Sequence, residues 1–121
     1  MLVLENFLSD RGSRYAAAGG PCRSEVEAKA FLKQLKRRKK FAKATHNSWA
    51  CLSREHGPLW HDDGEAGAAA VILRMLEREE VQDEIVVVTR WFGGKHLGGD
   101  RFRHVQTVVR AYLDARGGKA C

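Results

Sequence analysis

One short segment, Ile85-Val86-Val87-Val88-Thr89, constrains the fold more than any other part of the chain. Its side chains are apolar or β-branched without a break, and β-branched residues favour extended backbone. A strand with no polar face suits the centre of a sheet, where both of its faces are covered. Trp91-Phe92-Gly93-Gly94 interrupts the pattern. We therefore expect a strand over residues 84–90 in the middle of a sheet.

Weaker patterns predict the elements around this strand. Apolar residues between turn residues predict strands near 2–8, 14–18, 45–52 and 59–60. Apolar spacings of three and four predict three helices: 25–38, one from the turn at 61–65 to 77–80, and one from Asp100 to a stop at Gly117-Gly118. Ser24 followed by Glu27 has the pattern of a capping box. Because helices and strands do not alternate strictly, we expect an α+β fold, with one mixed, mainly antiparallel sheet and helices packed on one face.

Length and composition predict a single domain over residues 1–121. No apolar run approaches the ~20 residues that a membrane-spanning helix needs, and the first seven residues do not have the pattern of a secretion signal. Cys22, Cys51 and Cys121 are widely spaced and include no zinc-binding pair; Cys51 is expected to be buried and Cys121 exposed. We expect a cytoplasmic protein with no membrane partner, no metal and no cofactor.

Positive charge is concentrated in the first half of the chain. The net charge is +6, and seven of the eleven residues from 33 to 43 are basic, a stretch that we call the basic segment: Lys33, Lys36, Arg37, Arg38, Lys39, Lys40 and Lys43. Such a cluster attracts RNA phosphates or an acidic protein surface. The alternative is a solvated helix end whose cations complement the helix dipole. The two interpretations are evenly matched, and we expect no DNA partner.

Four residues, Asp62-Asp63-Gly64-Glu65, form an acidic turn. Clustered carboxylates bind hard cations or act as general acids and bases. We favour a structural role at a helix start, in which Asp63 caps the helix, Gly64 permits the bend and Glu65 complements the dipole. The sequence therefore predicts no catalytic residue, and we further predict that Arg90 pairs with this turn.

A second turn, the glycine loop from Gly93 to Gly99, precedes the last predicted helix. Glycine amides can cradle an anion at a helix start. Here Asp100, as the predicted cap, would occupy those amides, and the ending of a phosphate-binding loop is absent. We therefore favour tight packing and positive φ angles for these glycines. Trp49, Trp60 and Trp91 are interpreted as packing residues rather than as base-stacking platforms.

Three segments together resemble the IMPACT family, the group of IMPACT/YigZ-like domains. They are Lys43-Ala44-Thr45-His46-Asn47-Ser48-Trp49-Ala50, the acidic turn, and Val86 through Gly98 to Asp100-Arg101-Phe102. The resemblance covers about residues 3–115 and favours the eukaryotic-type branch, as a single-domain member without the RWD domain. It implies the fold of the second domain of a small-subunit ribosomal protein and of domain IV of elongation factor G. Candidate binding residues carried by these motifs are His46, Asn47, Asp62, Asp63, Gly64, Glu65, Arg90, Trp91, Gly93, Gly94, Gly98, Asp100 and Arg101.

The resemblance also implies a function. Members of this family regulate translation by competing for the ribosome-associated co-activator of an amino-acid-starvation kinase. We accordingly expect a regulatory protein, not an enzyme, that binds a protein partner on or near the ribosome. An RNA-binding module that uses the basic segment is the alternative, and an enzyme that depends on the acidic turn is the third hypothesis.

Overall fold

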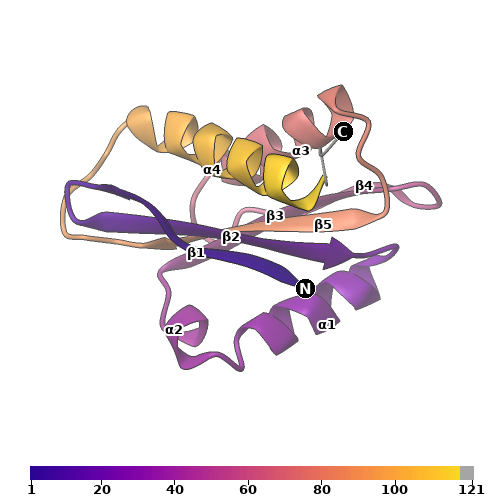
Figure 1. Ribbon diagram of the computed structural model, residues 1–121, viewed down its shortest axis with the longest axis horizontal. Coiled ribbons are helices and arrows are strands. Elements are labelled where there is room, and N and C mark those ends of the chain that lie inside the picture. Colours follow the sequence, from indigo (N-terminus) through magenta and orange to yellow (C-terminus); the bar gives the residue numbers. More distant parts are fainter. Residues whose placement is uncertain (118–121) are drawn as a thin grey trace.

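A computed structural model describes residues 1–117 and contains a five-stranded sheet with strand order β1-β2-β5-β3-β4 (Figure 1). The strands are β1 (Leu2–Asp10), β2 (Ser13–Pro21), β3 (His46–Ser53), β4 (Gly57–His61) and β5 (Glu84–Trp91). Within these residues every strand pairing is antiparallel. The α+β class and the central position of the 84–90 strand are thus confirmed. Cys121 and the predicted stop at Gly118 lie outside the described residues.

Helices cover both faces of this sheet, so the prediction of helices on one face is wrong. The helices α1 (Glu25–Leu35) and α2 (Lys39–Ala42) lie under one face, and α3 (Ala68–Arg78) and α4 (Asp100–Arg116) lie over the other (Figure 1). Side chains alternate along β5: Ile85 and Val87 pack against α1 and α2, whereas Val86 and Val88 pack against α3 and α4. A strand that is apolar on both faces needs a helical layer on each.

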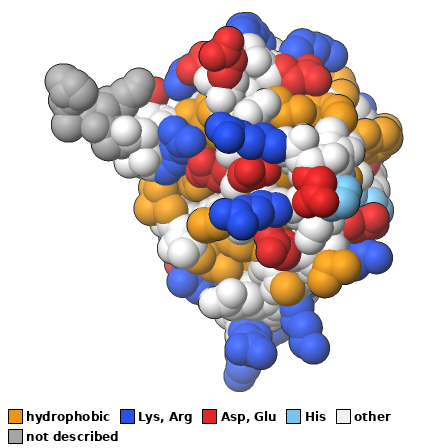
Figure 2. Space-filling model, turned by 90° about the vertical axis from the view of Figure 1, so that its right-hand side faces the viewer, with side chains coloured by type: hydrophobic (Ala, Val, Ile, Leu, Met, Phe, Trp, Pro, Cys, Tyr) orange, Lys and Arg blue, Asp and Glu red, His pale blue; other side chains and the backbone are white. Residues whose placement is uncertain are grey.

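The end of the molecule where β2 ends and β5 begins carries charges of both signs. Acidic and basic side chains lie next to one another across this surface (Figure 2). Arg116 donates to Glu84 at 2.7 Å, and the Arg54 guanidinium lies 4.0 Å from the Asp83 carboxylate. Opposite charges therefore pair across this end of the molecule.

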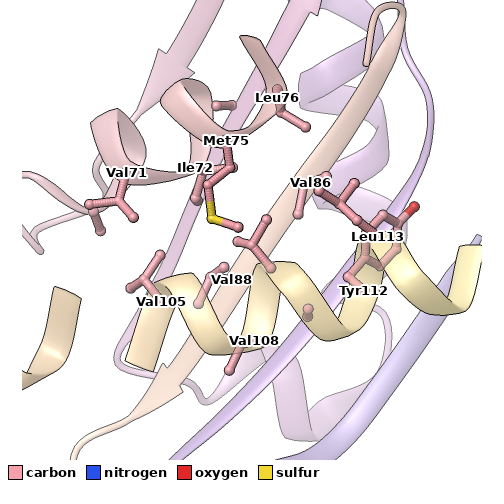
Figure 3. Packing of buried hydrophobic residues seen from close by; sticks show 14 of the residues in the cluster. Val71, Ile72, Met75, Leu76, Val86, Val88, Val105, Val108, Tyr112 and Leu113 are labelled. Atoms are coloured by element: carbon pink, nitrogen blue, oxygen red, sulfur yellow. The ribbon is translucent and has the colours of Figure 1, made fainter. Parts of the chain in front are cut away.

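The larger of the two cores lies between β5 and the helices α3 and α4 (Figure 3). Val86 and Val88 contact a layer formed by these helices, including Ile72, Val105 and Tyr112. The smaller core, on the α1 side, includes Phe31, Leu35, Phe41 and the buried thiol of Cys51. Within residues 1–117 no helix is both long enough and apolar enough to cross a membrane.

The capping box predicted at the start of α1 is confirmed. The Ser24 hydroxyl accepts from the Glu27 amide at 3.1 Å, and the Glu27 carboxylate accepts from the Arg23 amide at 2.7 Å. The helix ends at Leu35, three residues before the predicted end at Arg38. A longer helix would stack like charges three and four residues apart, which is unfavourable. Instead Arg38 is extended and the short helix α2 follows.

Candidate functional site

The three motif segments come together at one end of the molecule. The start of β3, the end of β5, the acidic turn and the start of α4 border a cavity of about 380 Å³, at the left-hand end in Figure 1. We call it the motif cavity; its lining is Thr45, His46, Gly64, Glu65, Ala66, Arg90, Phe92, His96, Leu97 and Arg101. A second cavity of about 430 Å³, between α3 and α4, contains none of the candidate residues.

A buried ion pair forms the wall of the motif cavity. Arg90 Nη1 donates to Glu65 Oε2, and both residues are only 5% exposed. Arg90 Nη2 also donates to the hydroxyl of Ser13 at 3.3 Å. The predicted pairing of Arg90 with the acidic turn is confirmed, and Glu65 is the partner. The role of Ser13 was not predicted, because nothing in the sequence around Ser13 indicates a contact with Arg90.

The other two carboxylates of the acidic turn bond to backbone amides. Asp62 Oδ2 accepts from the Gly67 amide at 3.2 Å and Oδ1 from the Ala69 amide at 2.9 Å, so Asp62 caps α3. Asp63 instead accepts from the Asn47 amide at 2.6 Å. The prediction that Asp63 caps the helix is therefore wrong: Gly67 holds the cap position of α3, and the Asp63 carboxylate bonds to β3 instead.

These bonds leave the acidic turn unsuited to metal binding in its present geometry. Among residues 1–117 no three His, Cys, Asp or Glu side chains are grouped so that they could hold a metal ion. Each carboxylate of the turn already accepts from the protein. The arrangement holds the turn against β3 and β5 and shapes the cavity wall.

His46 and Asn47 have different surroundings although they are neighbours. His46 lines the motif cavity, and its Nδ1 lies 2.9 Å from the Asp63 carbonyl oxygen. A carbonyl oxygen only accepts, so Nδ1 carries the proton and Nε2 is left without a partner among the described residues. Asn47 is buried on the opposite face, where it accepts from Thr89 at 2.7 Å and donates to the Phe41 carbonyl at 3.3 Å. Of the two, only His46 is available to a ligand.

The glycine loop has the tight packing and the positive φ angles that its sequence predicts. A Cβ atom on Gly93 would lie 2.1 Å from the carbonyl carbon of Gly12, so no side chain fits there. Gly94 and Gly98 have φ angles of 93° and 58°, in the left-handed region that favours glycine. The loop brings Phe92 and His96 to the rim of the cavity, with ring centroids 5.5 Å apart.

Asp100 does not cap α4, contrary to the prediction. Gly99 occupies the cap position and, as a glycine, has no side chain with which to cap the helix. The Asp100 carboxylate pairs with Arg11 at 2.6 Å and with Arg103 at 3.3 Å. Two guanidinium groups compete for the oxygens that would otherwise bond to the helix amides. The Asp100 carboxylate, although in the first turn of α4, is therefore held by arginines and not by the helix amides.

Arg101 is the unusual residue of the motif cavity. It is partly buried, and its guanidinium lies 4.7 Å from the ring centroid of Phe102. Within residues 1–117 it has no hydrogen-bond acceptor or ion-pair partner, and its Nε is buried without a partner. Arg101 was predicted by resemblance, but Phe92 and His96 were not. Phe92 lies directly before the motif glycines and His96 lies among them, and neither has a pattern of its own that indicates a site.

The basic segment lies at the same end of the sheet as the motif cavity, but under the opposite face. Arg38 and Lys40 pair with Glu5 at 3.6 and 3.3 Å. The remaining cations are exposed: Lys33, Lys36, Arg37, Lys39 and Lys43. Trp91 anchors the segment, since its Nε1 donates to the Lys40 carbonyl at 2.9 Å.

The three tryptophans differ in exposure. Trp49 and Trp91 are only 7% and 8% exposed, so the packing role predicted for these two is confirmed. Trp60, on the edge strand β4, is 57% exposed. The sequence does not distinguish Trp60 from the other two, because a short strand reveals neither its neighbours nor its position at a sheet edge.

Comparison with known proteins places these motifs in a family. Residues 11–113 match the model of the Impact N-terminal domain. The chain is 37% identical to a Protein IMPACT homolog of Caenorhabditis elegans over 88% of its length, and 38% identical to the Saccharomyces cerevisiae homolog over 89%. It is 36% identical to human Protein IMPACT over 88% of its length. The chain spans 44%, 46% and 35% of these three relatives, respectively.

Two solved structures have a similar fold. A crystal structure of a hypothetical protein matches with a TM-score of 0.79 at 24% identity, covering 93% of this chain and 57% of that one. The structure of the two-domain translational regulator Yih1 matches with a TM-score of 0.52 at 35% identity, covering 88% of this chain and 43% of that one. The first similarity supports the fold alone.

Proposed function

This chain belongs to the IMPACT family, and on that premise we propose that it regulates translation by binding a protein partner on or near the ribosome. The proposed partner is the ribosome-associated co-activator of the amino-acid-starvation kinase. One observation carries the proposal: three motifs that are separate in the sequence form one continuous end of the molecule around the motif cavity. We further propose that residues 1–121 form one IMPACT-type domain that acts in the cytoplasm.

The chemistry of the motif residues supports binding rather than catalysis. Glu65 is neutralised by Arg90, and Asp62 and Asp63 bond to backbone amides. A general acid or base must instead reach a substrate proton. In contrast, Phe92 is 42% exposed at the rim of this end of the molecule, and exposed aromatic residues are common anchors of protein interfaces.

Binding to the purified co-activator tests the proposal. Phe92→Ala should weaken the complex at least about tenfold, the effect of losing an aromatic anchor. Trp60→Ala is a control, because it removes an exposed aromatic ring from β4, outside the lining of the motif cavity. Sedimentation in cell lysate then asks whether the native chain migrates with ribosomes. An absence of co-activator binding, or equal losses in both variants, would contradict the proposal.

RNA binding through the basic segment is the second candidate, favoured by its exposed cations that have no acidic partner. We expect Gln substitutions at Lys36, Arg37, Lys39 and Lys43 to weaken RNA binding and to lower the dependence of log affinity on log salt concentration. These positions spare the contacts of Arg38 and Lys40 with Glu5. A control with the same charge change carries Gln at Arg23, Lys29, Arg74 and Arg78. RNA binding that is equal in the two variants would exclude the basic segment.

A further inference from the structure

We propose that the motif cavity binds a nucleoside monophosphate, with its phosphate at Arg101 and His46 and its base against Phe92. The partner proposed above would contact the exposed rim around Phe92, whereas the interior of the motif cavity, about 380 Å³, is open to a small ligand. That volume falls within the range of small-molecule sites, roughly 300–1,000 Å³. The proposal does not depend on the partner proposed above.

The charge of the cavity favours an anion. Glu65 neutralises Arg90, which leaves Arg101 as a lining cation without a carboxylate partner among residues 1–117. A partly buried charge with no partner is unfavourable, and a bound anion would relieve that cost. Asp100, the carboxylate next to Arg101 in sequence, is held by Arg11 and Arg103.

The orientation of Arg101 suits a phosphate in particular. Its guanidinium lies over the ring of Phe102, 4.7 Å from the centroid. A guanidinium that stacks on an aromatic ring keeps its N–H donors in the plane of the group, where they are free to form a fork with two oxygens. Such paired, charge-assisted hydrogen bonds are the strong ones for phosphate recognition.

His46 provides a second polar group for the phosphate. Because Nδ1 donates to the Asp63 carbonyl, the ring is fixed and Nε2 is left for a ligand. In the neutral ring Nε2 accepts from a protonated phosphate oxygen, and in the imidazolium it donates to a charged one. A Cβ atom on Gly64 would lie only 3.3 Å from Nδ1, so the acidic turn packs closely against the ring. The imidazole is thus positioned before any ligand arrives.

The rim of the cavity provides a surface for the base. Phe92 is 42% exposed, and the ring of His96 lies beside it at 5.5 Å with an interplanar angle of 43°. Nucleobases stack on such aromatic side chains with little dependence on base identity. Inorganic phosphate or a simple carboxylate would use Arg101 but would not extend to the aromatic rim, where the Phe92 ring lies 5.6 Å from the Arg90 guanidinium. The nucleotide is therefore the ligand that uses both parts of the site.

Isothermal titration with adenosine 5′-monophosphate, inorganic phosphate and adenosine tests the proposal. We expect the nucleotide to bind most tightly, phosphate more weakly, and adenosine weakest. Arg101→Gln should weaken nucleotide binding at least about tenfold, as expected for a lost charge-assisted hydrogen bond. Arg110→Gln, a change of the same kind on the same helix outside the lining of the motif cavity, should leave the affinity unchanged. Phe92→Ala should weaken binding of the nucleotide but not of phosphate.

Several results would overturn the proposal. These are no nucleotide binding, nucleotide no tighter than phosphate, or equal losses from Arg101→Gln and Arg110→Gln. Thermal unfolding shows whether each variant is folded. If Arg101→Gln does not fold, the amide chemical shifts of the native chain test the site instead. Addition of nucleotide should change the amide resonances of residues 45–46 and 98–101. Shifts confined to residues 36–43 would place the ligand on the basic segment and exclude the cavity.

Discussion

Replacing Glu65 by alanine removes the carboxylate that neutralises a buried guanidinium. Glu65 and Arg90 are each 5% exposed, and the only other hydrogen bond described for the Arg90 side chain is its 3.3 Å donation to Ser13. Removing one partner of a buried ion pair costs about 3–5 kcal/mol, because the remaining charge stays buried without compensation. For a domain of this size, about 4 °C of melting temperature is lost for each kcal/mol. Thermal unfolding followed by circular dichroism should therefore show a decrease of roughly 10–20 °C.

Matched variants separate the burial of charge from other effects. The double variant Glu65→Leu with Arg90→Met replaces the pair by apolar side chains of similar size, and should recover most of the stability. Arg110→Ala breaks exposed ion pairs on α4 and should cost less than about 1 kcal/mol. If Arg90→Ala or Glu65→Ala melts at the temperature of the native protein, the pair does not hold the acidic turn in place and our reasoning is refuted.

Three further predictions concern other elements. Gly93→Ala should lower the free energy of unfolding by about 1–3 kcal/mol in chemical denaturation, because the added Cβ atom meets backbone atoms. Gly99→Ala, with open space around it, should be neutral or slightly stabilising. Equal effects of the two variants would contradict the packing argument. Asp62→Ala should cost about 1–2 kcal/mol through the lost cap of α3, and Asp62→Asn should cost less; a neutral alanine variant would refute the capping role. The pKa of Asp10 is lowered to about 2, chiefly by the hydrogen bond from the neighbouring arginine, so its contribution to stability is present above about pH 4 and is lost as the pH falls towards 2. Asp10→Asn should remove that part of the pH dependence of the melting temperature. An unchanged pH profile would show that the ion pair of Asp10 with Arg11 does not contribute to stability.

The central strand was predictable because its signal lies within a few consecutive residues. An unbroken apolar run identifies a strand with two covered faces wherever it occurs, and β5 has both. The capping box at Ser24 was predictable for the same reason, since its two partners lie within four residues. The layer arrangement was not: the periodicity of a helix shows which of its residues are buried, but not which face of the sheet receives them.

The candidate site was only partly predictable, because several donors compete for each carboxylate and the sequence does not show which donor is nearest. Asp63 and Asp100 each have the residue type and position of a helix cap. Their carboxylates bond instead to the Asn47 amide and to Arg11, which approach from distant parts of the chain. The pairing of Arg90 with the acidic turn was predicted as a link between two motifs, and Glu65 is the partner. That Arg101 has no carboxylate partner among residues 1–117 is seen only once its surroundings are known.

The position of β5 determines when the domain can acquire its shape during synthesis. Residues 1–83 contain four of the five strands, but only as two separate hairpins, β1-β2 and β3-β4. Isolated two-stranded hairpins are at best marginally stable in water. Until residues 84–91 are available, β2 and β3 each have an unpaired inner edge. Their later pairing with β5 joins residues as far apart in sequence as Arg14 and Trp91. A nascent chain that stalls before Glu84 therefore exposes two open edges, the state in which β proteins are most prone to associate with one another.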